Sequence, residues 1–104
     1  MRRRYLALRV ESEGSMDRGE LAEAIWKAVT QLFGEYGASQ AGIVLIEYDE
    51  QSGRGVVRCS HKALPMVRAS IASITRINGK PTAIRVFGVS GTLKALHKKV
   101  RETC

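Results

Sequence analysis

The chain has 104 residues, of which 44% are hydrophobic and 26% are charged, and its formal net charge at pH 7 is +7. This length fits one domain over residues 1–104, and this composition excludes a disordered chain. No apolar run approaches the ~18–20 residues of a membrane span, and two cysteines make no disulfide framework, so we expect a cytoplasmic protein without membrane contact.

Charge is sorted by sign along the chain. Residues 1–10 carry +4, residues 11–50 carry −7 and residues 51–104 carry +10. A basic half of this kind indicates a polyanionic partner, most often nucleic acid. A second interpretation stays open, because folding can interleave the two signs on the surface.

The first half of the chain predicts a strand, a helix and a second strand. Tyr5–Val10 alternates in polarity, as a half-buried strand does. Asp17 and Glu20 have the spacing of a capping box, and the apolar residues that follow predict an amphipathic helix. We expect this helix to end within residues 34–37, where two glycines lie. Ile43–Tyr48 then predicts a strand.

The second half predicts a hairpin partner, a helix and a last strand. A polar loop over residues 49–53 leads into a strand over Gly55–His61, as in a hairpin. Pro65 suits the first turn of a helix, which we expect to end at Asn78-Gly79. Pro81–Val89 predicts the last strand.

A short C-terminal helix is predicted after the turn Ser90-Gly91-Thr92. Glycine and hydroxyl residues at a helix N-terminus, followed by Lys94, suit a bound phosphate. An ordinary helix cap explains the same residues, so both interpretations stay open. The residues expected to face inward are Leu93, Leu96, His97 and Val100, whereas Lys94 and Lys98 face water.

The order of these elements predicts an α/β (α+β) domain of the ferredoxin-like type. A β-α-β-β-α-β order forms a four-stranded antiparallel sheet with two helices on one face, here with an extra C-terminal helix. Right-handed crossovers place the first and third strands in the middle. The other face of the sheet is then left for a partner.

Strand parity predicts which side chains that second face carries. Arg9, Arg58 and Arg85 point outward, together with Tyr5 and Phe87. Guanidinium groups pair with phosphates and aromatic rings stack on bases, which favours RNA contact. A protein interface explains the same face equally well. The third strand carries no aromatic residue, unlike RNA-recognition motifs.

No catalytic or metal site is predicted. Cys59, His61, His97 and Cys104 lack the spacing of a zinc finger. Ser60 and His61 are adjacent on a strand, so their side chains point to opposite faces and cannot act as nucleophile and base. We therefore expect no cofactor.

Three stretches carry a family resemblance: Arg3–Val10, Gly55–His61 and Arg85–Lys94. The first is a basic strand, the second contains Arg-Cys-x-His, and the third runs from a strand through Ser-Gly-Thr into a helix. In this combination the chain resembles the archaeal ribonuclease P protein component 2 family over nearly its whole length.

The resemblance implies a non-catalytic, RNA-binding subunit of ribonuclease P, the endoribonuclease complex that removes 5′ leaders from precursor tRNA. In that complex the RNA subunit carries the catalytic metal site. The implied partners are ribonuclease P RNA, precursor tRNA, other protein subunits and ribonuclease P protein component 3, with which the family can form a dimer of heterodimers. The residues expected to contact RNA or a partner are Arg9, Arg58, Arg85, Ser90, Gly91, Thr92, Lys94 and Lys98.

Two other functions remain open on the residues alone. One is a small phosphate-handling enzyme on the same sheet, although no activated nucleophile or acid–base pair is visible. The other is a protein-interaction module that binds no RNA.

Overall fold

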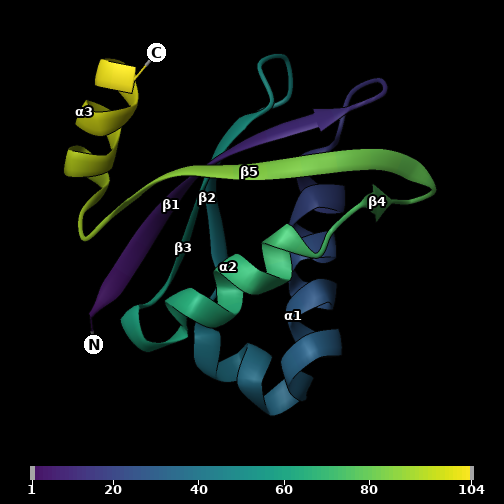
Figure 1. Ribbon diagram of the computed structural model, residues 1–104, viewed down its shortest axis with the longest axis horizontal. Helices are drawn as coiled ribbons and strands as arrows, with labels where there is room; N and C mark the ends of the chain where they lie inside the picture. Colours follow the sequence, from purple (N-terminus) through teal and green to yellow (C-terminus); the bar gives the residue numbers. More distant parts are fainter. Residues whose placement is uncertain (1, 104) are drawn as a thin grey trace.

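The computed structural model describes residues 2–103, with the side chains of residues 2–99. A mostly two-layer arrangement of helices on a twisted antiparallel sheet is visible in Figure 1. In chain order the elements are β1 (Arg3–Ser12), α1 (Arg18–Ala41), β2 (Val44–Asp49), β3 (Arg54–Ser60), a 3₁₀ turn η1 (His61–Ala63), α2 (Leu64–Ala72), β4 (Arg76–Ile77), β5 (Lys80–Ser90) and α3 (Leu93–Thr103).

Over the described residues the sheet has five strands in the order β2-β3-β1-β5-β4. The four long strands follow the predicted order, with β1 and β3 between β2 and β5. The prediction of four strands is wrong, because the two-residue strand β4 pairs with the start of β5 at the edge. The sheet is therefore an antiparallel sheet of an α+β domain, with an added hairpin at its edge.

The added hairpin arises from Asn78-Gly79, which we expected to end a helix. Both residues have positive φ angles, 51° at Asn78 and 80° at Gly79. A two-residue turn of type I′ requires this conformation, and Ile77 pairs with Lys80 across it. The second helix ends instead at Ala72, well before this turn.

The main core lies between the sheet and the pair α1 and α2. Leu6 and Leu8 of β1, Leu21 and Ile25 of α1, and Ile71 of α2 are almost completely buried in it. Each such side chain contributes roughly 1.5–3 kcal/mol relative to leaving it exposed. The inward parity predicted for β1 is thus the parity that the core uses.

Helix α1 is interrupted at Gly34, within the range where we expected it to end, but it does not stop there. Gly34 leaves the helical conformation, with φ 80° and ψ 168°, and the helix resumes with a changed direction as far as Ala41. Gly42 then ends it in the left-handed conformation. One glycine therefore kinks the helix, and a later one stops it.

The predicted capping box at the start of α1 is also wrong. Asp17 occupies the N-cap position, but its side chain makes no capping hydrogen bond. The carboxylate of Glu20 accepts a hydrogen bond of 2.9 Å from Nδ2 of Asn78 instead. This contact ties the start of α1 to the β4–β5 turn, which lies far away in the sequence.

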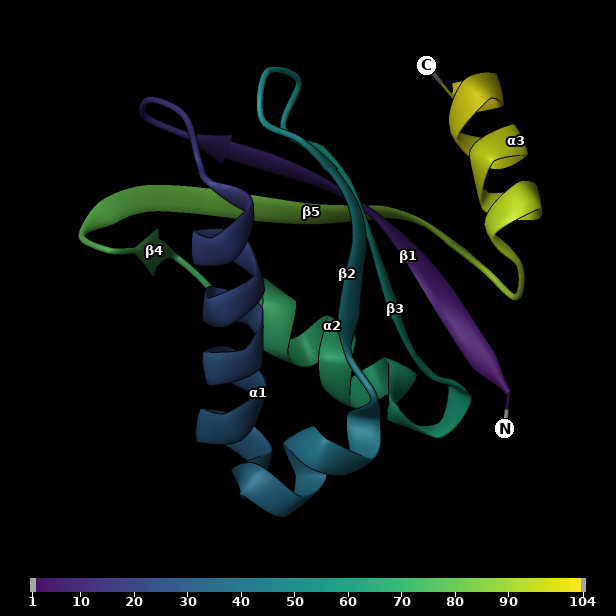
Figure 2. The same cartoon turned by 180° about the vertical axis from the view of Figure 1, so that it is seen from behind.

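Helix α3 packs on the sheet face opposite α1 and α2, here called the open face, as Figures 1 and 2 both show. Leu96 is fully buried against Ala7 and Val56. Nε2 of His97 lies 3.0 Å from a carboxylate oxygen of Glu47 on β2. The expectation that this face is left clear is thus corrected, because α3 covers its middle.

The remaining residues of α3 largely follow the predicted pattern. Leu93 is partly buried in the same cluster as Leu96, and Lys94 and Lys98 are exposed. Nζ of Lys99 donates a hydrogen bond of 3.0 Å to the carbonyl oxygen of Val89. Val100, also expected to face inward, lies outside the side chains that the structure describes. The helix is therefore seated by few contacts and presents lysines to solvent.

Gly53 closes the β2–β3 loop against the central strand. Its carbonyl oxygen accepts a hydrogen bond of 2.7 Å from the backbone N–H of Val10. It has a φ of +74°, and a Cβ atom there would collide with the carbonyl oxygen of Val10. Only glycine fits this position without moving the backbone.

We expect Gly53→Ala to lower the free energy of unfolding by at least ~2 kcal/mol, since it combines an unfavourable φ with a backbone collision. Gly14→Ala is the matched control, because Gly14 has a similar φ of +78° but open space around it. That control should lose only about 1 kcal/mol. Urea denaturation of both variants tests this, and equal losses would contradict it.

Candidate nucleic-acid interface

Three arginines from neighbouring strands lie side by side on the open face. Arg9 of β1 pairs with Arg54 of β3 on one side and with Arg85 of β5 on the other. Neighbouring strands are ~4.8 Å apart and paired residues point to the same face. All three side chains are exposed. We call Arg54, Arg9 and Arg85 the arginine row.

The arginine row has no carboxylate partner among the described side chains, whose one ion pair joins His97 to Glu47. Asp49 lies opposite Arg54 on the neighbouring strand. The carboxylate oxygens of Asp49 instead accept hydrogen bonds from the N–H of Gln51 and the hydroxyl of Ser52. Like charges directly opposite one another destabilise a sheet by roughly 0.2–1 kcal/mol per pair. A bound anion would remove this repulsion.

Arg58 does not join the row. It pairs with Tyr5, four residues further along β3 than Arg54, or about 13 Å away at ~3.3 Å per residue. Val56 lies between the two arginines, beneath Leu96 of α3. The Nε atom of Arg58 is buried and has no hydrogen-bond partner. Helix α3 therefore divides the open face into two parts.

The hydroxyl groups of the turn Ser90-Gly91-Thr92 cap the start of α3. The Thr92 hydroxyl accepts a hydrogen bond of 3.2 Å from the N–H of Ala95, and the Ser90 hydroxyl accepts one of 3.4 Å from the N–H of Thr92. Gly91 lies beside Arg4, whose Nη1 would be 3.3 Å from a Cβ atom at position 91. The ordinary cap accounts for both hydroxyls, and Arg4 adds positive charge next to them.

Sequence reasoning missed Arg54 as a site residue. We expected the loop to end at residue 53 and the strand to start at Gly55, which left Arg54 outside both, whereas β3 starts at Arg54 itself. Residues 54, 56 and 58 share one face of a strand, so the parity that points Arg58 outward also points Arg54 outward. That signal was present in the sequence.

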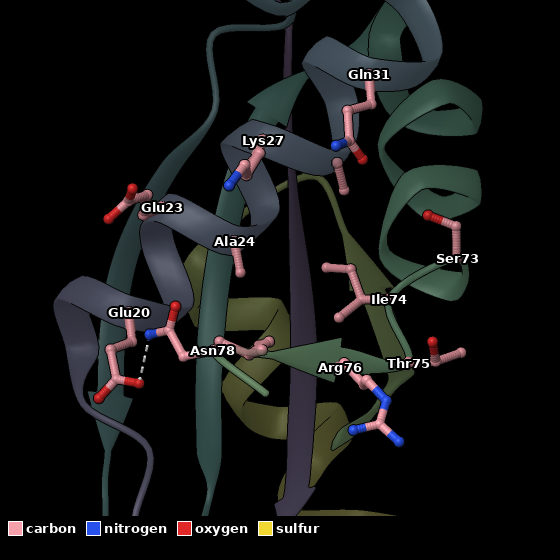
Figure 3. Close-up of a pocket in the computed structure, with 12 residues that line it drawn as sticks. Glu20, Glu23, Ala24, Lys27, Gln31, Ser73, Ile74, Thr75, Arg76 and Asn78 are labelled. Atoms are coloured by element: carbon pink, nitrogen blue, oxygen red, sulfur yellow. Dashed lines mark hydrogen bonds between the residues drawn. The ribbon is translucent and has the colours of Figure 1, made fainter. Parts of the chain in front are cut away.

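A polar groove lies away from the open face, between α1 and the segment from α2 to β4, as Figure 3 shows. Its walls carry Glu20 and Glu23 on α1 together with Lys27, and Arg76 on β4. Because two acidic and two basic side chains line it, the groove offers no net attraction to a polyanion. The groove is therefore a poorer candidate for RNA than the arginine row.

The described residues contain no group of three His, Cys, Asp or Glu side chains that could hold a metal ion. Among these same residues, no helix has both the length and the apolar character needed to cross a bilayer. Cys59 is completely buried in the main core. Burial raises the pKa of its thiol to about 11, although the charge of Arg4 opposes this.

The comparisons with known proteins agree with one another on the family. Residues 4–101 match the Rpp14/Pop5 family. The chain belongs to this family. It is 39% identical over 98 residues to ribonuclease P protein component 2 of Pyrococcus furiosus, covering 94% of this chain and 82% of the relative. It is 35% identical over 98 residues to the protein of the same name from Methanosarcina mazei, covering 94% of this chain and 83% of that relative.

A solved structure shares the fold. The chain resembles a protein chain in the cryo-EM structure of yeast ribonuclease MRP, with a TM-score of 0.74 over 98% of this chain and 90% of that one. Their sequences are 16% identical, so this likeness concerns the fold alone. The resemblance expected from the sequence is thus confirmed at the level of the family.

The raised pKa of the buried Cys59 thiol predicts how the free energy of unfolding depends on pH. Cys59 titrates near pH 9 when unfolded and near 11 when folded, so the unfolded state loses its proton first and is favoured as pH rises between these values. We expect the free energy of unfolding to fall in this window by up to ~1.4 kcal/mol per pH unit more steeply in the wild type than in Cys59→Ala. Urea denaturation across the window measures both slopes. Parallel curves would contradict the assignment.

Proposed function

We propose that the chain is the RNA-binding component 2 subunit of ribonuclease P, which helps the catalytic RNA remove 5′ leaders from precursor tRNA. Membership of the Rpp14/Pop5 family and the names of the archaeal relatives support this. In this role the chain is a non-catalytic part of a ribonucleoprotein. A cytoplasmic location suits the free thiol of Cys59, which a reducing compartment preserves.

The observation that carries the proposal is the arginine row. Three adjacent, unpaired guanidinium groups can each form two parallel hydrogen bonds to a phosphate. Contacts of this kind fix the position of a nucleic acid and are independent of its sequence. Lys94 and Lys98 are exposed on α3, which packs on the same face of the sheet and adds positive charge to it. We therefore assign the row to the RNA backbone, with Arg58 and the turn at Ser90 as secondary contacts.

The protein partner, for which we propose ribonuclease P protein component 3, needs a different surface. Leu32, Phe33 and Tyr36 are 52%, 45% and 78% exposed around the kink of α1 at Gly34. These residues lie in the segment of residues 11–50, which carries −7. Apolar and aromatic side chains among acids suit a protein and repel RNA. Two such pairs could then assemble as a dimer of heterodimers.

Reconstituted cleavage of a precursor tRNA tests the function. Catalytic RNA is assayed with component 3, with and without this chain, and we expect the chain to raise the rate of cleavage. The alanine variants of Arg9, Arg54 and Arg85 should each weaken binding to ribonuclease P RNA. If roughly four phosphates are contacted, log affinity falls against log salt with a slope near −3, and each variant reduces that slope by about 1.

Arg68→Ala is the matched control, because Arg68 is exposed on α2, away from the open face. It should keep both the affinity and the salt slope of the wild type. No increase in cleavage, or an affinity that salt does not change, contradicts the proposal.

A separate experiment addresses the partner surface. Leu32→Asp places a charge in the exposed apolar patch of α1 and should abolish co-purification with component 3, since a desolvated carboxylate there would have no partner. Binding of ribonuclease P RNA by the variant should be unchanged. Lys27→Asp, on the same helix at the polar groove, is the control for added negative charge. Equal retention of component 3 by both variants would exclude this surface.

A further inference from the structure

A hollow of about 350 Å³ opens on the open face between α3 and the β2–β3 hairpin. Its base is formed by Ala7 and Val56, and its sides by Phe87 of β5 and His97 of α3. Arg54 also lines it. Because Arg54 belongs to the arginine row as well, the hollow and the row form one continuous surface.

The aromatic wall of the hollow results from an irregularity in the sheet. Ala7 pairs with Gly88 and Leu8 with Val86, so Phe87 is an extra residue, a β-bulge, in β5. Bulges re-aim side chains and are frequent next to functional sites. The ring of Phe87 is 36% exposed. It therefore offers a partly uncovered aromatic surface above a small apolar base.

The charges around the hollow decide which part of an RNA fits it. Glu47 and Asp49 line it on the β2 side, so a phosphate placed inside would be repelled. Both carboxylates keep unused lone pairs after their contacts with His97 and with the hairpin turn. A neutral, planar group that donates hydrogen bonds suits this lining, whereas the phosphate suits the arginines next to it.

We propose that the hollow binds one unstacked nucleobase of an RNA strand whose phosphates lie on the arginine row. The base stacks on Phe87, as bases do on aromatic side chains in single-strand sites. Its exocyclic amino group donates to Glu47 or Asp49, as the N4 amino group of cytosine does to carboxylates. The hollow therefore prefers cytosine to uracil, which has a carbonyl oxygen in place of that amino group. This inference rests on the proposed function and adds a contact that reads the base.

The test compares short single-stranded oligocytidylate and oligouridylate of equal length, bound by the full chain and followed by fluorescence anisotropy. We expect the wild type to bind oligocytidylate more tightly. Phe87→Leu keeps an apolar side chain but removes the stacking surface, and should weaken that binding roughly tenfold. The salt slope should not change, because no phosphate contact is lost.

Trp26→Leu is the matched control, because Trp26 is an exposed aromatic residue on α1, away from the hollow. It should bind both oligonucleotides as the wild type does. Asp49→Asn should reduce the preference for cytosine while the salt slope stays near its wild-type value. Nuclear magnetic resonance adds a measurement that needs no variant, since a base in the hollow shifts the methyl signal of Ala7 and the ring signals of Phe87.

Several outcomes would overturn the hollow as a base site. One is equal binding of oligocytidylate by Phe87→Leu and Trp26→Leu, with no shift at Ala7. Another is that Phe87→Leu loses component 3 but keeps RNA, which would make the hollow a protein contact. Cytidine 5′-monophosphate binding as tightly as the oligonucleotide would make it a free-nucleotide site. In each case binding of ribonuclease P RNA can persist, so the proposed function is judged separately by the cleavage assay.

Discussion

The pairing of β1 with β3 on one side and β5 on the other is the constraint on which the structure depends. This register places Leu6 and Leu8 in the main core and brings Arg54, Arg9 and Arg85 together on the opposite face. A slip of one residue would exchange the two faces of the strand and bury a charge. The burial of the leucines therefore also fixes the position of the arginines.

Helix α3 determines the shape of the open face, because it covers the middle of that face. Without it, the face would be one broad surface on which Arg58 and the arginine row were equivalent. Leu96 packs on Ala7 and Val56 and so covers the middle of the open face. His97 contacts Glu47 and so joins α3 to β2. The result is a bounded hollow next to exposed positive charge.

The sequence predicted elements best where one period of hydrophobicity dominates. Alternation in Tyr5–Val10 indicated the strand and its inward residues, and Arg9 and Arg85 were both placed outward, as the register has them. Errors fell on turn chemistry. Asn78-Gly79 fits a helix end or a hairpin, and only pairing with Lys80 selects the hairpin. The capping box does not form: the Asp17 side chain makes no cap hydrogen bond, and Glu20 instead accepts one from Asn78, which is distant in sequence.

By itself, the sequence determined the strand parities, the order of the long elements and the concentration of positive charge in residues 51–104, since each depends on local period or composition. Only the tertiary structure decided which charges meet. It joined Arg54 to Arg9 and Arg85, separated Arg58 from them, and placed α3 on the open face. These are matters of register and of helix docking, which depend on contacts between residues far apart along the chain and leave no periodic signal within any one segment.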